Sequence, residues 1–197
     1  MRILRASDYR RMPWKNGKGE TVEIAVFPET ATVDDFDWRI SMATVAEDGP
    51  FSVFPDIDRT LSVLTGDGIE LSVAGQPDHV LRPQTAPHAF PADAVTSAKL
   101  LSGPITDLNV MTRRGRFTHS VTLLPTGRSA VRSDSSALTL VLVTSDVLLK
   151  DGTLLAAYDA ILLHPGDSDV EFHLTVTATT FLVRIASRQK ASVSLQV

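Results

Sequence analysis

The sequence predicts an all-β protein with very little helix, folded as sandwiches or barrels of short strands. Runs in which apolar and polar residues alternate recur along the chain, and this is the period of a strand with one buried face. Turn residues separate the runs at short intervals, as in Glu47-Asp48-Gly49-Pro50 and Thr65-Gly66-Asp67-Gly68. Glycine, proline and aspartate favour such turns. The 3.6-residue period of an amphipathic helix is hard to find.

The first half of the chain begins with one expected helical turn and continues as strands. Ser7 is the expected cap of a turn over 7–11, and Pro13 ends it. Pro28 ends the first long strand, and the two turns quoted above end the later ones. The expected strands are 21–27, 37–45, 59–64, 69–73, 80–81, 97–101 and 107–111.

The second half continues the strand pattern, with a faint echo of the first half. The segment 65–69 resembles 144–148, and 80–83 resembles 162–165. Two similar barrels would explain the echo, although matches this short also arise by chance. We expect an N-terminal barrel at 1–120 and a C-terminal barrel, a scaffold or dimer surface, at 121–197. The polar segment 125–136 is either their boundary or a long surface loop. The expected strands are 117–123, 138–144, 147–150, 154–158, 160–163, 170–174 and 180–185.

Composition excludes several classes of protein. The 197 residues include 19 basic and 23 acidic side chains, for a net charge of −4, so no basic surplus indicates nucleic-acid binding. Cysteine is absent, which excludes disulfides, thiolate metal sites and cysteine nucleophiles. No apolar run is long enough to span a bilayer, and the first residues lack the apolar core of a signal peptide. We therefore expect a cytoplasmic protein with no membrane or nucleic-acid partner.

The stretch Pro13–Ile24 points to a ligand pocket. Trp14, Lys15 and Asn16 directly precede a glycine-rich segment, and glycine lets the backbone take positive φ and approach a ligand closely. The alternative is a tight hairpin turn at Asn16-Gly17 with a tryptophan packed beside it. The tryptophan and the lysine exceed what a turn requires, which favours the pocket.

Cationic side chains on the expected strands could bind an anion. Arg39 and Ser41 share one face of their strand, whereas Trp38 lies on the other, and Asn109, Met111 and Arg113 share a face of theirs. Arginine presents a planar fork suited to carboxylate, and alternate residues face the interior of a small barrel. The alternative is that these arginines face solvent or pair with acidic residues, of which Glu23, Asp37 and Asp58 are the candidates.

Four ordered blocks between Met12 and Arg114 resemble the HutD/Ves family. The blocks are Pro13–Ile24, Phe36–Ser41, Asp48–Arg59 and Gly103–Arg114. The resemblance implies a two-barrel, cupin-type fold (a bicupin). It also implies a link to histidine utilisation, in which the protein binds a small acid such as N-formylglutamate rather than catalysing a step. The chain departs from the family at Lys18, which interrupts the usual run of glycines and is either strained or an added cation at the pocket mouth.

The sequence predicts neither a metal site nor a cofactor. Cupin enzymes usually bind metal through two closely spaced histidines, a glutamate and a later histidine. The five histidines of this chain lie more than five residues apart, although His79 and His88 could still meet from different strands. No Gly-x-Ser-x-Gly nucleophile motif and no phosphate-binding loop occurs.

These observations favour a binding protein for a small anionic metabolite in the N-terminal barrel. Two alternatives stay open: a metal-independent hydrolase or isomerase acting on an amino-acid derivative, and a structural or partner-binding protein. A homodimer is also open. The cationic groups expected to bind the anion are Lys15, Arg39, Arg59 and Arg113. The polar groups expected to orient it are Asn16, Thr21, Ser41 and Asn109, and Glu23 is expected to organise the arginines. The apolar walls are expected to be Trp14, Trp38 and Met111.

Overall fold

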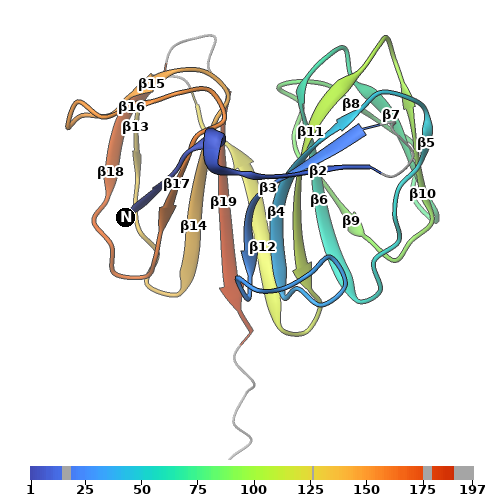
Figure 1. Cartoon of the computed structure of the whole chain (residues 1–197), viewed down its shortest axis with the longest axis horizontal. Coiled ribbons are helices and arrows are strands. Elements are labelled where there is room, and N and C mark those ends of the chain that lie inside the picture. The colour runs from blue at the N-terminus through green and yellow to red at the C-terminus, as the bar shows by residue number, and fades with distance from the viewer. Residues whose placement is uncertain (15–18, 126, 175–178, 189–197) are drawn as a thin grey trace, which may run out of the picture.

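Two β-lobes lie side by side in the structure (Figure 1), a computed structural model that describes residues 1–14, 19–125, 127–174 and 179–188. Within these residues the one helical element is the 3-10 turn η1 (Ala6–Asp8), so the all-β prediction is confirmed. The turn is shorter than expected, because Arg10–Pro13 form strand β2 and pair with the next strand. No helix in this part of the chain has the length and apolarity needed to cross a membrane.

The first lobe, on the right in Figure 1, consists of two antiparallel sheets. Leu61, Leu71 and Ile105 are fully or almost fully buried between them and belong to the lobe's interior core. The six-stranded sheet has the order β2, β3 (Gly19–Phe27), β4 (Trp38–Val45), β11 (Ile105–Arg113), β6 (Ile57–Thr65) and β9 (His88–Pro91). The four-stranded sheet has the order β5 (Gly49–Pro50), β10 (Thr96–Leu100), β7 (Ile69–Val73) and β8 (His79–Leu81).

The second lobe, on the left, is built on a five-stranded sheet with two small sheets beside it. Its interior core includes Val141, Ile161 and Phe172. The five-stranded sheet has the order β1 (Arg2–Leu4), β17 (Ala160–Leu163), β14 (Ala137–Val143), β19 (Thr180–Ser187) and β12 (Phe117–Leu123). The small sheets pair β13 (Gly127–Val131) with β18 (Val170–Leu174), and β15 (Val147–Leu148) with β16 (Leu154–Leu155).

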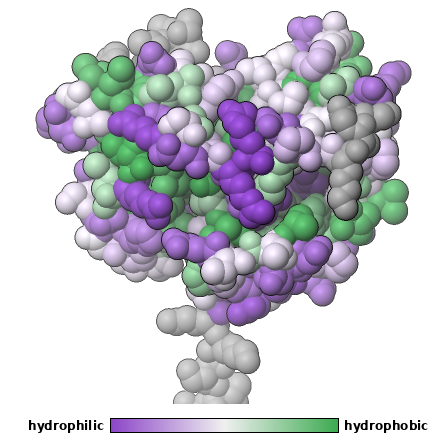
Figure 2. All heavy atoms as spheres, in the orientation of Figure 1, coloured by the Kyte–Doolittle hydropathy of each residue, from purple (hydrophilic) through white to green (hydrophobic). Residues whose placement is uncertain are grey.

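A third apolar core joins the lobes. Trp38 and Ile40 of β4 and Leu108 of β11 pack in one cluster with Leu140 of β14 and Phe181 of β19. Because successive side chains of a strand point to opposite faces, β4 and β11 contribute one face to this shared core and the other to their own lobe's interior. β4 and β11 are therefore buried on both faces along most of their length. On the outer surface, hydrophilic residues are interspersed with apolar ones across both lobes (Figure 2).

The division of the chain at residue 120 stays a prediction, but strand pairing does not follow it. β1 pairs with β17 from Arg2 to Leu4, and β12 pairs with β19 along its whole length. Both strands therefore belong to the sheet of the second lobe, although both begin before residue 120. The segment 125–136, expected as a boundary or a surface loop, contains β13 and so contributes a strand to the second lobe.

His119 connects the two lobes through hydrogen bonds. Its Nε2 lies 2.8 Å from Oγ1 of Thr60 on β6, and its Nδ1 lies 2.7 Å from Oγ1 of Thr112 on β11. A neutral imidazole has one donor and one acceptor nitrogen, so it satisfies two hydroxyl groups without carrying charge. Burial lowers the pKa of His119 to about 4, while the nearby Asp58 carboxylate acts weakly in the opposite direction.

We expect His119 to make the fold sensitive to acid. Between its unfolded pKa near 6.5 and its folded pKa near 4, the unfolded chain binds more protons, so stability falls as the pH falls. The loss from pH 7 to pH 5 amounts to about 2 kcal/mol. Urea unfolding at both pH values should show His119→Gln losing less stability on acidification than the parent chain. An equal loss in both proteins would contradict this role.

Candidate functional site

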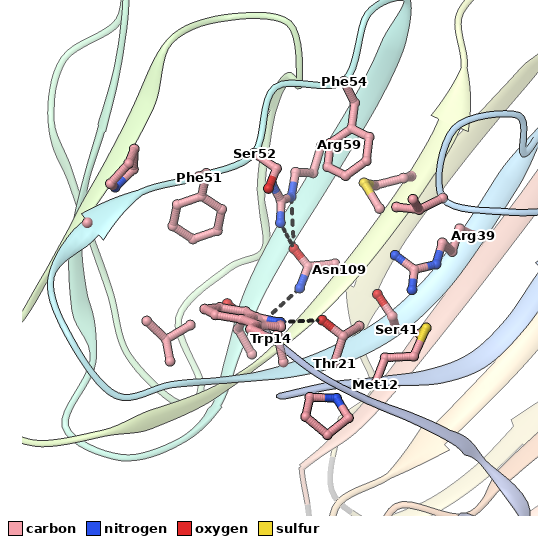
Figure 3. Close-up of a pocket in the computed structure, with 18 of the residues that line it drawn as sticks. Met12, Trp14, Thr21, Arg39, Ser41, Phe51, Ser52, Phe54, Arg59 and Asn109 are labelled. Carbon is pink, nitrogen blue, oxygen red and sulfur yellow. Dashed lines mark hydrogen bonds between the residues drawn. The ribbon is translucent and has the colours of Figure 1, made fainter. Parts of the chain in front are cut away.

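A cavity of about 770 Å³ lies in the first lobe, over the inward faces of β3, β4, β11 and β6 (Figure 3). Arg39 and Ser41 reach it from β4, Arg59 from β6, and Asn109 from β11. Trp14, the first residue after β2, covers one side. The alternation of the strands thus brings together polar residues that are up to 70 positions apart in the chain, as in Arg39 and Asn109.

Strand register places two arginines on either side of one methionine. Met111 on the central strand β11 is paired with Arg39 of β4 and with Arg59 of β6. Two residues further along β11, Asn109 is paired with Ser41 of β4, and Asp107 follows after two more. The inward-facing side chains of β11 are therefore one apolar, one amide and one carboxyl group in succession.

Arg59, Asn109 and Asp107 form a chain of hydrogen bonds. Nε of Arg59 donates to Oδ1 of Asn109 at 2.8 Å, and Nη2 of Arg59 donates to the same oxygen. Nδ2 of Asn109 in turn donates to Oδ1 of Asp107 at 2.6 Å. The Arg59 guanidinium also lies over the ring of Phe51, 4.6 Å from its centroid, a cation–π geometry.

Burial perturbs both charged ends of this chain. The Arg59 pKa is lowered to about 10, principally by burial, which still leaves the guanidinium charged at neutral pH. Burial raises the pKa of Asp107 to about 6, while the charge of Arg59 and the hydrogen bond from Asn109 act to lower it. Oδ2 of Asp107 has no hydrogen-bond partner among the described residues.

Arg39 is oriented by Glu23. Its Nε donates to Oε2 of Glu23 at 2.7 Å, and both side chains are largely buried. The two Nη atoms of Arg39 make no hydrogen bond to the described part of the protein, nor does Nη1 of Arg59. Two guanidinium groups thus line the cavity with donor atoms that are not used by the protein around them.

Trp14 is fixed beside the cavity by both its backbone and its ring. Its Nε1 donates to Oγ1 of Thr21 at 2.8 Å, and its backbone N–H donates to the carbonyl of Gly19. A Cβ atom at Gly19 would lie 2.9 Å from the indole ring and closer still to the carbonyl of Thr44. Gly19 is therefore required for close approach of the tryptophan rather than of a ligand. Lys15, Asn16 and Lys18 lie outside the described residues.

Two of the predicted site residues do not line the cavity. Trp38 lies on the opposite face of β4 from Arg39, in the core shared by the lobes, where its ring stacks on Phe27. Its assignment as a cavity wall is wrong, because the pleat of β4 turns it away. Arg113, the last residue of β11, donates from Nη2 to the carbonyl of Phe36 at 2.8 Å. Its guanidinium is used at the strand end, so its assignment to the anion site is also wrong.

Sequence reasoning missed Asp107 and the aromatic and polar residues of one loop. Asp107 lies two positions before Asn109, so the same alternation could have found it. Phe51, Ser52 and Phe54 line the cavity from the irregular segment after β5, where no strand period indicates which side chain points inward.

Comparison with known proteins identifies the family. The model of the family HutD matches residues 6–183. The chain belongs to the HutD family. A protein of Pseudomonas putida, described as an uncharacterised 21.2 kDa protein in the hutC 3′ region, is 37% identical over 171 residues, which cover 85% of this chain and 88% of the relative. Protein Ves of Citrobacter koseri is 42% identical over 113 residues, which cover 55% of this chain and 58% of Ves.

Solved structures agree with this assignment. HutD from Pseudomonas fluorescens SBW25, in a structure described as the formate condition, matches with a TM-score of 0.81 and 29% identity over 95% of this chain and 98% of that one. The expected resemblance to the HutD/Ves family is confirmed, and so is the cupin-type β fold. The chain is a cupin-fold protein of a family associated with histidine utilisation.

The described residues do not fit a cupin metal centre. Bacterial pirin YhhW of Escherichia coli, described in complex with nickel(II), shares the fold at 11% identity, with a TM-score of 0.58 over 93% of this chain and 97% of that one. In the HutD-family chain, His79 and His88 do meet, with ring centroids 4.0 Å apart. No cluster of three or more His, Cys, Asp or Glu side chains accompanies them within the described ranges. A pair of imidazoles with no third protein ligand falls short of the usual donor set.

Proposed function

We propose that this HutD-family protein binds a small carboxylate metabolite, such as N-formylglutamate, in the cavity of the first lobe. The observation that carries the proposal is the pair of guanidinium groups, Arg39 and Arg59, whose remaining donors line the cavity. Arginine pairs with carboxylates through two parallel hydrogen bonds, and such charge-assisted bonds are strongest away from bulk water.

The electrostatics of the cavity support an anion more at Arg59 than at Arg39. Arg39 already has a carboxylate partner in Glu23. Arg59 donates instead to the neutral amide of Asn109, which separates it from the carboxyl of Asp107. The Asp107 carboxyl acts on Arg59 only through space, across the amide of Asn109, so a ligand carboxylate would give this guanidinium a direct charge-assisted hydrogen bond that it otherwise lacks.

The size and walls of the cavity support a metabolite-sized ligand. A volume of about 770 Å³ is within the range of small-molecule sites, which combine apolar walls with a few oriented polar groups. Phe51, Phe54 and Met111 supply apolar surface here, and Ser41 adds a hydroxyl group. A hollow first lobe of this kind counts against a purely structural role, for which a solidly packed interior is expected.

A metal-independent enzyme is the second candidate, because one observation favours it. A carboxyl group with a pKa near 6 at a ligand cavity, Asp107, is suited to general acid–base chemistry near neutral pH. Incubation of the purified protein with N-formylglutamate, followed by proton NMR, would show release of formate if the protein hydrolyses the amide. Binding without any product would leave the binding protein as the function.

Isothermal titration with N-formylglutamate tests the proposal. We expect binding that weakens with added salt and that Arg39→Ala weakens about tenfold, since a hydrogen bond to a charged group contributes about 1.5–3 kcal/mol. Arg113→Ala is the matched control: it removes a guanidinium used outside the cavity and should leave the affinity unchanged. Absence of binding heat with the parent protein at several temperatures would defeat the assignment of the ligand.

A further inference from the structure

The cavity holds one acidic group that anion binding does not explain. Asp107 is fully buried, and only one of its two carboxyl oxygens is used: Oδ1 accepts the hydrogen bond from Asn109, whereas Oδ2 has no partner among the described residues. A buried carboxylate oxygen with no donor is costly, and buried polar atoms in native proteins nearly always have a partner.

The described neighbours of Asp107 do not hydrogen-bond to Oδ2. On the adjacent strands Asp107 is paired with Ala43 of β4 and Val63 of β6, whose side chains are apolar. The backbone N–H of Ala43 acts on the carboxyl and lowers its pKa, but it makes no hydrogen bond to Oδ2. Thr21 follows on β3, where its Oγ1 is bonded to the indole N–H of Trp14, and it makes no hydrogen bond to Oδ2 of Asp107. The charged groups nearest to it on the packed strands are Arg59 on β6, which bonds to Asn109, and Arg39 on β4 with its partner Glu23 on β3.

The position of Asp107 relative to the arginines defines the kind of ligand that could supply the donor. Along β11, Asp107 lies four residues before Met111, the residue paired with both Arg39 and Arg59. The hydrogen bonds of the two arginines lie nearer to Asp107: Arg59 bonds to Asn109, and Arg39 bonds to Glu23, which lies at the same level of the sheet as Asn109. Residues two apart on a strand are separated by about 6.6–6.8 Å. A ligand whose carboxylate lies at the arginines can therefore reach Asp107 with a group several bonds away.

We propose that Oδ2 of Asp107 accepts a hydrogen bond from an N–H group of the ligand and so selects N-acyl amino acids over acids of equal charge and size that lack the N–H. This inference rests on the proposed function, because it uses the same cavity and the same arginines. It adds a preference for ligands that carry an N–H group. Two arginines alone would not give this preference, since guanidinium groups hydrogen-bond only to the anionic part of the ligand. A site built to accept a ligand N–H rejects the analogue without it, because the buried acceptor is then left unpaired.

Protonation of Asp107 should control this selectivity. Because burial raises its pKa to about 6, the carboxylate is mostly ionised and an acceptor at pH 7.5, and mostly protonated at pH 5. The protonated oxygen no longer offers the same acceptor to an N–H. The preference for the N–H ligand should therefore decline as the pH falls through 6.

Titration calorimetry with a matched pair of ligands tests the inference. The pair is N-formylglutamate and its freshly dissolved ester isostere 2-formyloxyglutarate, in which an oxygen atom replaces the N–H while charge and shape are kept. Glutarate serves as the plain dicarboxylate. At pH 7.5 the parent protein should prefer the amide over the ester about tenfold or more, as expected for a hydrogen bond to a charged acceptor. The preference should shrink at pH 5.

Asp107→Asn completes the test from the side of the protein. The side-chain oxygen of asparagine can still accept from Asn109, but its amide nitrogen is a donor and cannot accept a ligand N–H. We expect the variant to lose the preference for the amide and to bind glutarate more tightly than the parent protein, because the anion no longer competes with the charge of Asp107 near Arg59.

The outcomes separate this inference from the proposed function. Equal affinity of the parent protein for amide and ester, with clear binding of both, would overturn the role of Asp107 and leave anion binding intact. A similar loss for all three ligands in Asp107→Asn would assign Asp107 to positioning Asn109 and Arg59, and would overturn selection as well. Failure of all three ligands to bind the parent protein would refute the proposed function itself.

Discussion

Replacement of Arg59 by methionine is expected to weaken binding of N-formylglutamate by about thirtyfold or more. Arg59 is the buried cation of the cavity whose hydrogen bonds go to a neutral amide, so a ligand carboxylate is its natural counter-charge. Truncation of one partner of a buried, hydrogen-bonded charge pair typically costs about 2–5 kcal/mol of binding free energy. Methionine keeps much of the apolar stem but also loses the contact of the guanidinium with the ring of Phe51.

Two further variants show whether the effect is specific to the guanidinium in the cavity. Arg59→Lys keeps the charge but loses the planar fork that bonds Asn109, and it should bind with intermediate affinity. Arg114→Met removes an exposed guanidinium that pairs with Asp58 and Asp93 outside the cavity. It changes the net charge equally and should bind as the parent protein does. Equal weakening in Arg59→Met and Arg114→Met would point to long-range charge and contradict a local site.

Arg59→Met should also change the titration of Asp107. The charge of Arg59 acts to lower the Asp107 pKa against the effect of burial. Without that charge, the pKa of Asp107 should rise further above its value of about 6, and the carboxyl should be protonated at a higher pH. A carbon-13 NMR titration of labelled aspartate would follow this shift directly.

Much of the fold could be predicted from alternation, because a strand with one buried face carries its own signature. The strand that ends at Phe27 is bounded by Pro28, a residue whose backbone preference is local, whereas Gly49-Pro50, expected as part of a turn, form the short strand β5. The pairing of β1 and β12 with the second lobe could not be predicted in this way. Neither strand differs in composition from its neighbours, and partner choice depends on contacts with strands far along the chain.

The residues of the cavity likewise fall into those that local alternation predicts and those that depend on the folded arrangement of the chain. Arg39, Ser41 and Asn109 line the cavity because they share inward faces that alternation reveals. The same rule excludes Trp38, and it identifies Asp107 once Asn109 is known to point inward. The contact of Phe51 with Arg59 arises from an irregular loop, so no period in the sequence could have revealed it.

The two faces of β4 and β11, one toward the cavity and one toward the core shared by the lobes, link the stability of the protein to the geometry of the cavity. Arg39, Ser41 and Asn109, which face the cavity from β4 and β11, each lie between two residues of the core shared by the lobes. A change on the shared face can therefore move the strand that carries Arg39 or Asn109. This arrangement predicts that the second lobe supports the cavity mechanically, although the lining residues of the cavity come from the first lobe.

Phe181→Ala is expected to destabilise the whole chain by about 3–5 kcal/mol, the usual cost of removing a buried phenylalanine ring. Phe181 is 1% exposed, lies on β19 of the second lobe and belongs to the shared core. Both tryptophans of the chain, Trp14 and Trp38, lie in the first lobe. Because Trp38 packs in the shared core, tryptophan fluorescence reports unfolding of the first lobe together with loss of its contact with the second, whereas far-ultraviolet circular dichroism reports the strands of both lobes.

In urea titrations we expect the two signals of Phe181→Ala to change together at a lower denaturant concentration, because loss of the shared core weakens both lobes at once. Phe172→Ala is a size-matched comparison, since Phe172 is 3% exposed within the interior core of the second lobe. If the lobes unfold as one unit, the fluorescence midpoint should fall in this variant too. A fluorescence midpoint that stays at the parent value in both variants, while the circular dichroism midpoint falls, would show that the first lobe and its cavity are stable without the second.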